Sequence, residues 1–149
     1  MTKLVLHVRT AWDDFFPATN PTNINAQTFS SRRSYTGAYI YVSNCLFISI
    51  TSASLGGALH CTSATYFLVE TCSFFTCRTS AGNGGAIYLV NTNDGQTVLH
   101  KVCGYDCCTT YSSSSNSYGQ FSYIDVYNVA SSKNCVNYSS ITSCVNQNS

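Results

Sequence analysis

The sequence contains only six acidic side chains, and these are the first candidates for catalytic residues. Enzymes that cleave acidic polysaccharides need clustered carboxylates, which bind Ca²⁺ or act as general acid and base, with a basic group nearby. When the repeated segments described below are aligned, only Glu70 and Lys101 fall at the same strand position. Asp106 and Asp125 are the pair that folding could still bring together. A carbohydrate-active lyase or hydrolase is therefore kept as an alternative, and no catalytic residue is assigned.

A second candidate is the compact set formed by His100, Cys103, Cys107 and Cys108, which carries the side chains that bind Zn²⁺. On a strand, however, residues 100 and 103 point to opposite faces, and so do residues 107 and 108. The four side chains would converge on one ion only in a tight turn. We therefore predict buried, stacked thiols beside an exposed histidine, with no metal and no cofactor.

Composition excludes several classes of partner. Charged residues make up 9% of the chain, the formal net charge is +1 and the mean hydropathy is +0.01. An ordinary soluble domain contains about 25% charged residues. This charge balance provides no electrostatic surface for nucleic acid, and little repulsion between molecules, so self-association is expected to be possible. No stretch approaches the ~18–20 apolar residues of a membrane-spanning helix, so no transmembrane segment is predicted.

Internal repetition is the strongest signal in the chain. Gly56-Gly57-Ala58-Leu59 recurs as Gly84-Gly85-Ala86-Ile87. A second block, with alternating apolar positions, occurs at residues 42–50, 69–77, 100–108 and 137–144. Aligned on one another, the copies of this block place like residues in three columns, namely Cys45, Cys72 and Cys103; Phe47, Phe74, Tyr105 and Ile141; and Cys77, Cys108 and Cys144.

Period-two alternation between clusters of Gly, Ser, Thr and Asn predicts short strands rather than helices. Identical residues would stack at the ~4.8 Å spacing of neighbouring strands, and thiols and flat rings suit such stacking. We therefore predict an all-β, right-handed parallel β-helix, a solenoid of about four coils formed by residues 36–149, in a chain that is a single domain overall. Gly57 and Gly85 are expected at corners, and the cysteine and aromatic columns are expected to be structural.

Residues 1–35 do not share the repeat. The segment from Ala11 to Pro17 mixes bulky apolar groups with two acids. Because an exposed edge strand invites pairing with another chain, the open end of a β-helix must be covered. We expect residues 1–35 to form an N-terminal cap that plugs the first coil, with Trp12, Phe15 and Phe16 pointing inward. A lid or a partner-binding arm is the alternative.

The two Gly-Gly-Ala-Leu/Ile motifs, alternating with Cys-x-Phe blocks, resemble the repeats of polymorphic outer-membrane-protein-like (Pmp-type) proteins, over about residues 36–144. The resemblance implies a right-handed parallel β-helix, a cell-surface or extracellular location and adhesion to host cells or matrix. The chain shows no export signal, so a complete chain of this sequence would be expected in the cytoplasm.

The sequence thus predicts a non-catalytic, surface or adhesin-like β-helix that presents Ser/Thr/Asn-rich faces to a protein or glycan partner. Two alternatives remain. One is a self-assembling scaffold or filament subunit that stacks end to end as a homo-oligomer, and the other is the carbohydrate-active enzyme considered above. Nine cysteines leave at least one thiol free unless it pairs with another chain.

Overall fold

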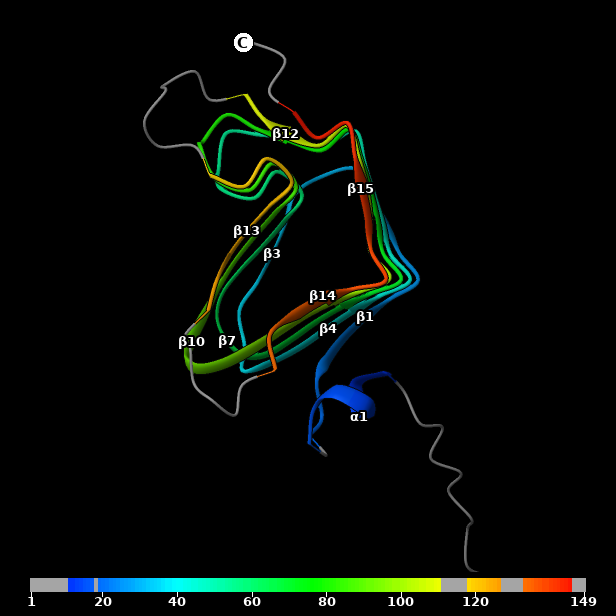
Figure 1. Cartoon of the computed structure of the whole chain (residues 1–149), viewed down its shortest axis with the longest axis vertical. Coiled ribbons are helices and arrows are strands. Elements are labelled where there is room, and N and C mark those ends of the chain that lie inside the picture. The colour runs from blue at the N-terminus through cyan, green and yellow to red at the C-terminus, as the bar shows by residue number, and fades with distance from the viewer. Residues whose placement is uncertain (1–10, 18, 111–117, 127–132, 146–149) are drawn as a thin grey trace, which may run out of the picture.

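The computed structural model describes residues 11–17, 19–110, 118–126 and 133–145, and this part of the chain is mostly β (Figure 1). Its strands form three sheets in which every strand pair is parallel. The prediction of an all-β fold with parallel strands is therefore confirmed.

The largest sheet contains β1 (Thr22–Asn25), β3 (Arg33–Tyr35), β4 (Tyr39–Ser43), β7 (Leu59–Glu70), β10 (Ile87–His100), β13 (Ser122–Asp125) and β14 (Cys135–Asn137). The five-stranded sheet contains β2 (Thr28–Phe29), β5 (Leu46–Ile48), β8 (Ser73–Phe75), β11 (Cys103–Tyr105) and β15 (Ser140–Thr142). The three-stranded sheet contains β6 (Thr51–Ser52), β9 (Arg78–Thr79) and β12 (Cys108–Thr109).

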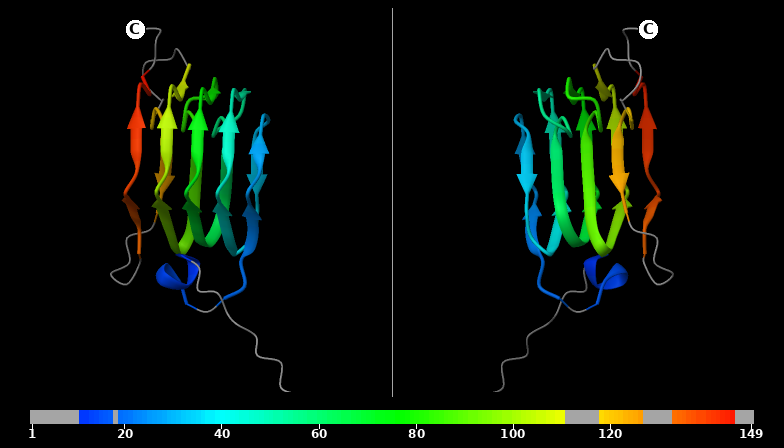
Figure 2. Two further views of the ribbon diagram at one scale, coloured as in Figure 1. Left: turned by 90° about the vertical axis from the view of Figure 1, so that its right-hand side faces the viewer. Right: turned by 90° about the vertical axis from the view of Figure 1, so that its left-hand side faces the viewer.

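The chain visits these sheets in turn, and each visit adds one strand beside the strand of the previous pass (Figure 2). β7 and β10 are long strands, and the two halves of each pair with different strands of the seven-stranded sheet. Their first halves lie between β3 and β13, and their second halves lie between β4 and β14. We call these two parts of the sheet the first limb and the second limb.

The core lies between the sheets and is filled by side chains that repeat from pass to pass. Phe29, Phe47 and Phe74 form one such column, with ring centroids 4.9 and 4.6 Å apart, and the last two rings are nearly parallel. All three side chains are at most 4% exposed. Burying each of these rings stabilises the fold by about 1.5–3 kcal/mol.

The third copy of the repeat lies one residue away from its expected register. Gly104, not Tyr105, pairs with Phe74, and the ring of Phe121 fills the space beside this glycine, 5.7 Å from the Phe74 ring. Since side chains alternate between faces, this shift turns Tyr105 outward, where it is 52% exposed. The expected placement of Tyr105 in the phenylalanine column was therefore wrong.

The same shift moves the cysteines. Cys103 pairs with Ser73 on β8 and is exposed, while Val102 takes the core position that follows Cys45 and Cys72. In the other thiol column, Cys107 takes the place expected for Cys108. The predicted Cys103 and Cys108 positions were wrong by one residue each.

Two sets of corners turn the chain from sheet to sheet, and each corner uses one residue with a positive φ. The first corners, which lead from the seven-stranded to the five-stranded sheet, use Ala26, Asn44, Thr71, Lys101 and Tyr138, and the second corners, which lead on to the three-stranded sheet, use Ser49, Thr76, Asp106 and Ser143. Left-handed backbone costs a residue other than glycine about 1–2 kcal/mol. Parallel pairing offsets this cost at each turn; for example, the N–H of Thr71 donates to the carbonyl of His100 at 2.9 Å.

Glycines serve a different turn, the one that leads into the first limb. Gly56 and Gly84 have φ of +68° and +67°. A Cβ atom on Gly57 would overlap the carbonyls of Arg78 and Gly85, and one on Gly85 would overlap the main chain of the next pass. Gly57 and Gly85 are therefore positions where neighbouring backbones approach too closely for any side chain.

The N-terminal segment joins the sheets earlier than the sequence suggested. β1, β2 and β3 all pair with later strands, so the repeated architecture begins at Thr22 and the expected boundary at residue 36 is too late. Residues 1–10 of the expected cap lie outside the described residues.

The cap's helix, α1 (Ala11–Phe15), lies beside the second limb rather than over the end of the first pass (Figure 2). Trp12 and Phe16 are buried against Tyr41, Leu68 and Val98, which point outward from successive strands of this limb. Among the residues described, no helix is long and apolar enough to span a membrane.

Candidate binding site

The acidic residues considered for catalysis lie on separate elements. Asp106 sits at a second corner, where its two carboxylate oxygens accept hydrogen bonds from Arg78 at 2.8 and 3.0 Å. Asp125 ends β13 on the first limb, in another sheet. Glu70 accepts a hydrogen bond from the Tyr41 hydroxyl. The expected meeting of Asp106 with Asp125 is not found.

The alignment of Glu70 with Lys101 was also wrong by one residue. Glu70 pairs with His100, and Lys101 is the corner residue that follows. The nearest basic neighbour of Glu70 along the sheet is therefore an imidazole that already has its own partners. His100 Nδ1 lies 2.7 Å from Asn137 Oδ1, and its ring contacts Phe15 edge-on at 5.4 Å.

The expected histidine and cysteine set does not converge on one point. His100 faces outward, Cys103 is exposed on β11, Cys107 is buried at the following corner, and Cys108 is buried on β12. Within the described residues, no group of three or more His, Cys, Asp or Glu side chains is arranged to hold a metal ion.

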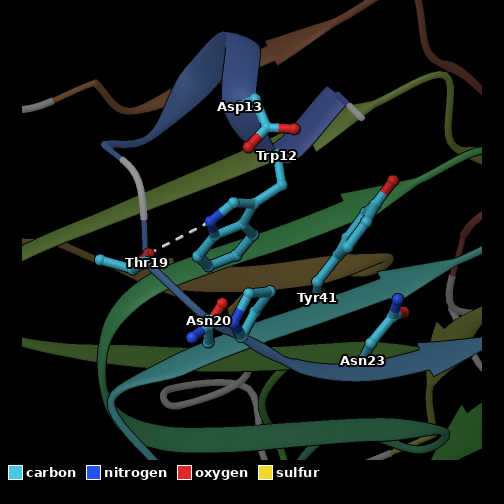
Figure 3. Close-up of a pocket in the computed structure, with 7 residues that line it drawn as sticks. Trp12, Asp13, Thr19, Asn20, Asn23 and Tyr41 are labelled. Atoms are coloured by element: carbon cyan, nitrogen blue, oxygen red, sulfur yellow. Dashed lines mark hydrogen bonds between the residues drawn. The ribbon is translucent and has the colours of Figure 1, made fainter. Parts of the chain in front are cut away.

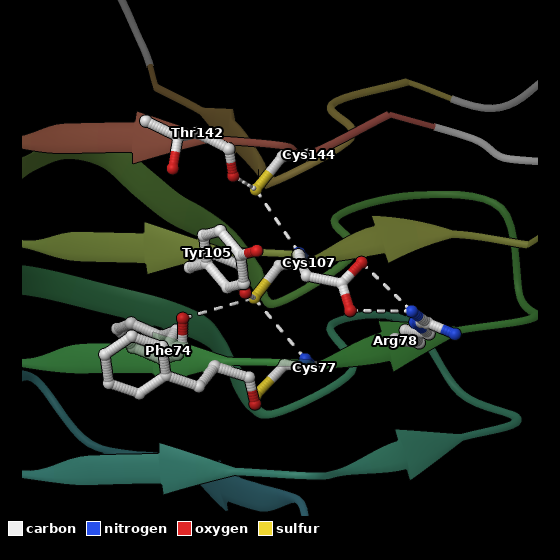
Figure 4. Close-up of polar contacts among 9 residues, drawn as sticks. Phe74, Cys77, Arg78, Tyr105, Cys107, Thr142 and Cys144 are labelled. Atoms are coloured by element: carbon white, nitrogen blue, oxygen red, sulfur yellow. Dashed lines mark hydrogen bonds and ion pairs between the residues drawn. The ribbon is translucent and has the colours of Figure 1, made fainter.

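The buried thiols instead form a hydrogen-bonded ladder along the corners (Figure 4). At the second corners, the thiol of Cys107 donates to the carbonyl of Tyr105 at 3.3 Å, and its sulfur accepts the main-chain N–H of Cys77 at 3.4 Å. Cys144 repeats the arrangement one pass later, accepting the N–H of Cys107 at 3.3 Å. Each thiol thus satisfies a buried N–H that the turning backbone leaves without a main-chain partner.

The first corners are held together by the same kind of hydrogen bonds. Cys72 donates to the Glu70 carbonyl at 3.2 Å and accepts the N–H of Cys45 at 3.4 Å. Ser139 does the same with its hydroxyl, which accepts the N–H of Val102 at 3.0 Å. The small size of Cys and Ser, together with their ability both to donate and to accept, explains why they recur at these corners.

Burial suppresses the reactivity of these thiols. It raises the pKa of Cys61 and of Cys72 to about 12, and that of Cys144 to about 11. The hydrogen bond to Cys77, together with burial, raises the pKa of Cys107 well above its usual value. Cys77 is the exception, because its hydrogen bond with Cys107 lowers its pKa, but its side chain is fully buried. Since the thiolate is the reactive species, the thiols with raised pKa values serve the ladder as hydrogen-bonding groups rather than as nucleophiles.

A pocket of about 200 Å³ opens where α1 meets the second limb (Figure 3). We call it the α1 pocket, and its lining consists of Trp12, Asp13, Thr19, Asn20, Pro21, Asn23 and Tyr41. Asp13 comes from α1, Asn20 from the segment before β1, and Asn23 from β1 itself.

Packing holds the aromatic part of the α1 pocket in place. Trp12 is 2% and Tyr41 6% exposed, and their rings lie 5.9 Å apart. The indole Nε1 of Trp12 donates to Thr19 Oγ1 at 3.2 Å. Burial and the hydrogen bond to Glu70 raise the pKa of Tyr41 well above its usual value, so its phenol stays a neutral donor.

The rim of the α1 pocket is polar and exposed. The side chains of Asn20 and Asn23 are exposed, and neither makes a hydrogen bond to another described residue. The sequence analysis placed Trp12 inside a cap over the first coil, whereas Trp12 packs on the outer face of the second limb, and the pocket there was not predicted. In the sequence, the run Asn20-Pro21-Thr22-Asn23 indicates only a turn. The pocket forms only because α1 packs against Tyr41, and no sequence pattern indicates that contact.

No protein-family model, curated protein or solved structure matches this chain.

Proposed function

We propose that the chain is a right-handed parallel β-helix and that it acts as a rigid, non-catalytic binding protein of the surface or adhesin type. The coil is supported by the parallel pairing of every described strand with a strand of an adjacent pass. The handedness is supported by the general rule that about 98% of parallel crossover connections are right-handed. The Pmp-like Gly-Gly-Ala motifs at residues 56–58 and 84–86 favour a cell-surface role.

The α1 pocket is the observation that carries the binding function. It combines a fixed aromatic floor with unpaired amide groups on its rim, which is the combination that small-molecule sites use to obtain both affinity and orientation. Elsewhere, the described acids that an enzyme would need are far apart in the fold or already paired. These features favour recognition without turnover.

The binding function is tested by probing the immobilised chain with arrays of glycans and of host-matrix proteins. Retention of one glycan or protein class, in the absence of any change to that partner, supports the proposal. Cleavage of a polysaccharide, detected as new reducing ends or unsaturated products, would support the enzyme alternative instead. Binding to neither array would overturn the proposal.

A specific observation also favours the second candidate, end-to-end association of copies of this chain. Val136 and Ile141 occupy core columns, opposite Leu99 and Gly104, yet they are 54% and 42% exposed because no described residue covers the last pass. At the other end, the guanidinium of Arg33 lies 4.6 Å from the Phe29 ring and helps to keep it buried. Among the described residues, the last pass thus leaves apolar side chains uncovered, and a second copy would bury them.

Sedimentation velocity over a range of concentrations tests this second candidate. We expect the mass to rise with concentration in the native chain but not in Val136→Thr/Ile141→Thr. Ile48→Thr is the matched control, since Ile48 is 38% exposed on β5 but lies away from the last pass. A larger species that reductant dissolves would indicate a disulfide through the exposed Cys103 or Cys135, and a constant monomer would exclude association.

A further inference from the structure

Two faces end the stack of described strands, and they lie at opposite ends of it (Figure 2). We call β1, β2 and β3 the head face, and β13, β14 and β15 the tail face. We infer that the protein forms a closed dimer in which the tail faces of two copies meet, while Arg33 protects each head face from association. This inference rests on the second candidate function, end-to-end association, and specifies which ends meet.

The strands of the tail face each have a pairing partner on one side. Among the described strands, β13 and β14 pair only with β10, and β15 pairs only with β11. An unpaired edge presents main-chain N–H and C=O groups that a strand of another chain can satisfy. A twofold axis would set equivalent edges of two copies antiparallel and would use the same surface of both copies, so the contact closes at two chains.

The tail face is apolar and hollow. A cavity of about 300 Å³ lies where β13 ends and β14 begins. It is lined by Thr97, Ile124, Val126, Asn134, Cys135 and Val136. The Oδ1 of Asn134 already accepts the main-chain N–H of Thr97 at 2.8 Å, whereas Val136 is 54% exposed. Apolar side chains of a second copy would fill this cavity and remove its apolar walls from water.

The tail face also carries little charge. In the described residues 118–126 and 133–145, Asp125 and Lys133 are the only charged side chains. Asp125 follows Ile124, which packs on the core, so the carboxylate lies on the outward side of β13. Lys133 Nζ donates to the Phe15 carbonyl of α1 at 2.9 Å, beside the second limb. Two tail faces can therefore meet without burying like charges.

The head face differs because Arg33 occupies a core position there. On β3, Arg33 pairs with Leu59, which pairs with Ile87, and both of these partners are fully buried. The guanidinium of Arg33 lies 4.6 Å from the centre of the Phe29 ring. Inward-pointing charged residues protect the edges of natural sheets from pairing with other chains. A copy stacked on the head face would bury this charge, and burying an unpaired ion is costly.

The tail face of another copy would not neutralise Arg33. Continuing the parallel register would place Arg33 beside Ser122, which is the next residue of its column. Asp125, the one acid among the described tail residues, lies on the opposite side of the sheet. Head-to-tail stacking would therefore bury an unpaired cation at every junction, whereas tail-to-tail contact buries none. This difference favours the dimer over a filament.

Sedimentation equilibrium in the presence of reductant distinguishes these assemblies. We expect the mass of the native chain to rise with concentration and to level off at twice the 16.2 kDa of one chain. A mass that continues to rise beyond two chains would overturn the inference but retain end-to-end association. The mass of one chain at every concentration would overturn both.

Ile141→Lys and Ile141→Glu test which faces meet, once circular dichroism has shown that both variants fold. Each variant alone should stay monomeric, because a twofold contact brings two like charges together. An equimolar mixture should recover the dimer, because the facing charges are then opposite. A mixture that stays monomeric would mean that the two tail faces do not meet. Ile48→Lys, at an exposed position on β5, is the matched control and should dimerise like the native chain.

Arg33→Leu tests the protection of the head face. Leucine would continue the column of Leu59 and Ile87 without a charge, so the head faces could also associate and the mass should exceed two chains. Arg33→Lys keeps the charge and should stop at two chains. An Arg33→Leu variant that also stops at two chains would refute the role of Arg33 in limiting assembly.

Discussion

The sulfur of Cys107 accepts the main-chain N–H of Cys77, from the previous pass of the chain, at 3.4 Å. This contact joins two passes at a corner where the backbone leaves a buried donor without a main-chain acceptor. Cys72 and Ser139 make the equivalent contact at the first corners. The corners therefore explain the frequent cysteines, because each of these positions needs a small side chain that accepts a main-chain N–H.

Replacing Cys107 tests the ladder. Cys107→Val keeps the approximate volume but leaves the N–H of Cys77 unsatisfied, which should cost about 1–3 kcal/mol in the free energy of unfolding. Cys107→Ser keeps a donor and acceptor, as Ser139 does, and should cost less. Urea denaturation followed by circular dichroism measures both. Cys103→Ser, at an exposed position, should change stability by less than about 0.5 kcal/mol. A valine variant as stable as the serine variant would refute the role of the thiol.

Alkaline pH should destabilise the protein through its buried thiols. Burial raises the pKa of Cys61 and Cys72 from the ordinary thiol value of 9.0 to about 12, so the folded chain holds these protons after the unfolded chain has released them. Their stabilising contribution is therefore complete below about pH 9 and is lost progressively up to about pH 12. Unfolding midpoints in urea, measured from pH 7 to 11, should fall above pH 9.

Cys72→Ser provides the control for this pH dependence, because serine does not titrate in that range. Its unfolding free energy should fall less steeply between pH 9 and 11 than that of the native chain. Equal slopes would mean that Cys72 titrates normally in the folded state.

The phenylalanine column should dominate the stability of the five-stranded sheet. Phe74→Ala removes a side chain that is fully buried between two rings, and it should cost about 3–5 kcal/mol. Tyr105→Ala, at a half-exposed position one residue beyond Gly104, should cost less than about 1 kcal/mol. Thermal unfolding compares the two variants, and similar losses would mean that Tyr105 does occupy the column.

Gly104 and Phe121 should be energetically coupled. A Cβ atom on Gly104 would overlap the Phe121 ring, so Gly104→Ala should be clearly destabilising in the native chain. In a Phe121→Ala background the added methyl group has room, and the same substitution should be neutral or stabilising. A double-mutant cycle by urea denaturation should yield a coupling energy of about 0.5–3 kcal/mol. Additive effects would show that the two residues do not share the site.

Sequence patterns were sufficient to predict the strands and their parallel stacking. The Gly-Gly-Ala-Leu/Ile motifs and the period-two blocks are local features, and each copy carries its own signal. Phe47 and Phe74 stack as expected, because their two copies have the same spacing on both sides of the ring.

The register of the third copy could not be read from these local patterns. Cys103-Gly104-Tyr105 matches Cys72-Ser73-Phe74 by residue type, yet Gly104 lies opposite Phe74 because Phe121, from a later pass, occupies the space that a ring would fill. The alternation of side chains makes that one-residue choice decide which residues are buried.

The sequence by itself determined that this chain is all-β, built from repeated parallel strands, with buried thiols and rings as its repeating contents. Only the tertiary structure decided the contacts between distant segments. The α1 pocket exists because Trp12 packs on Tyr41, and Ile141 on the last pass is 42% exposed because no other described residue covers it. The physical reason is that repeat patterns encode contacts between equivalent positions of adjacent passes, whereas packing between non-equivalent segments depends on where the folded chain brings them.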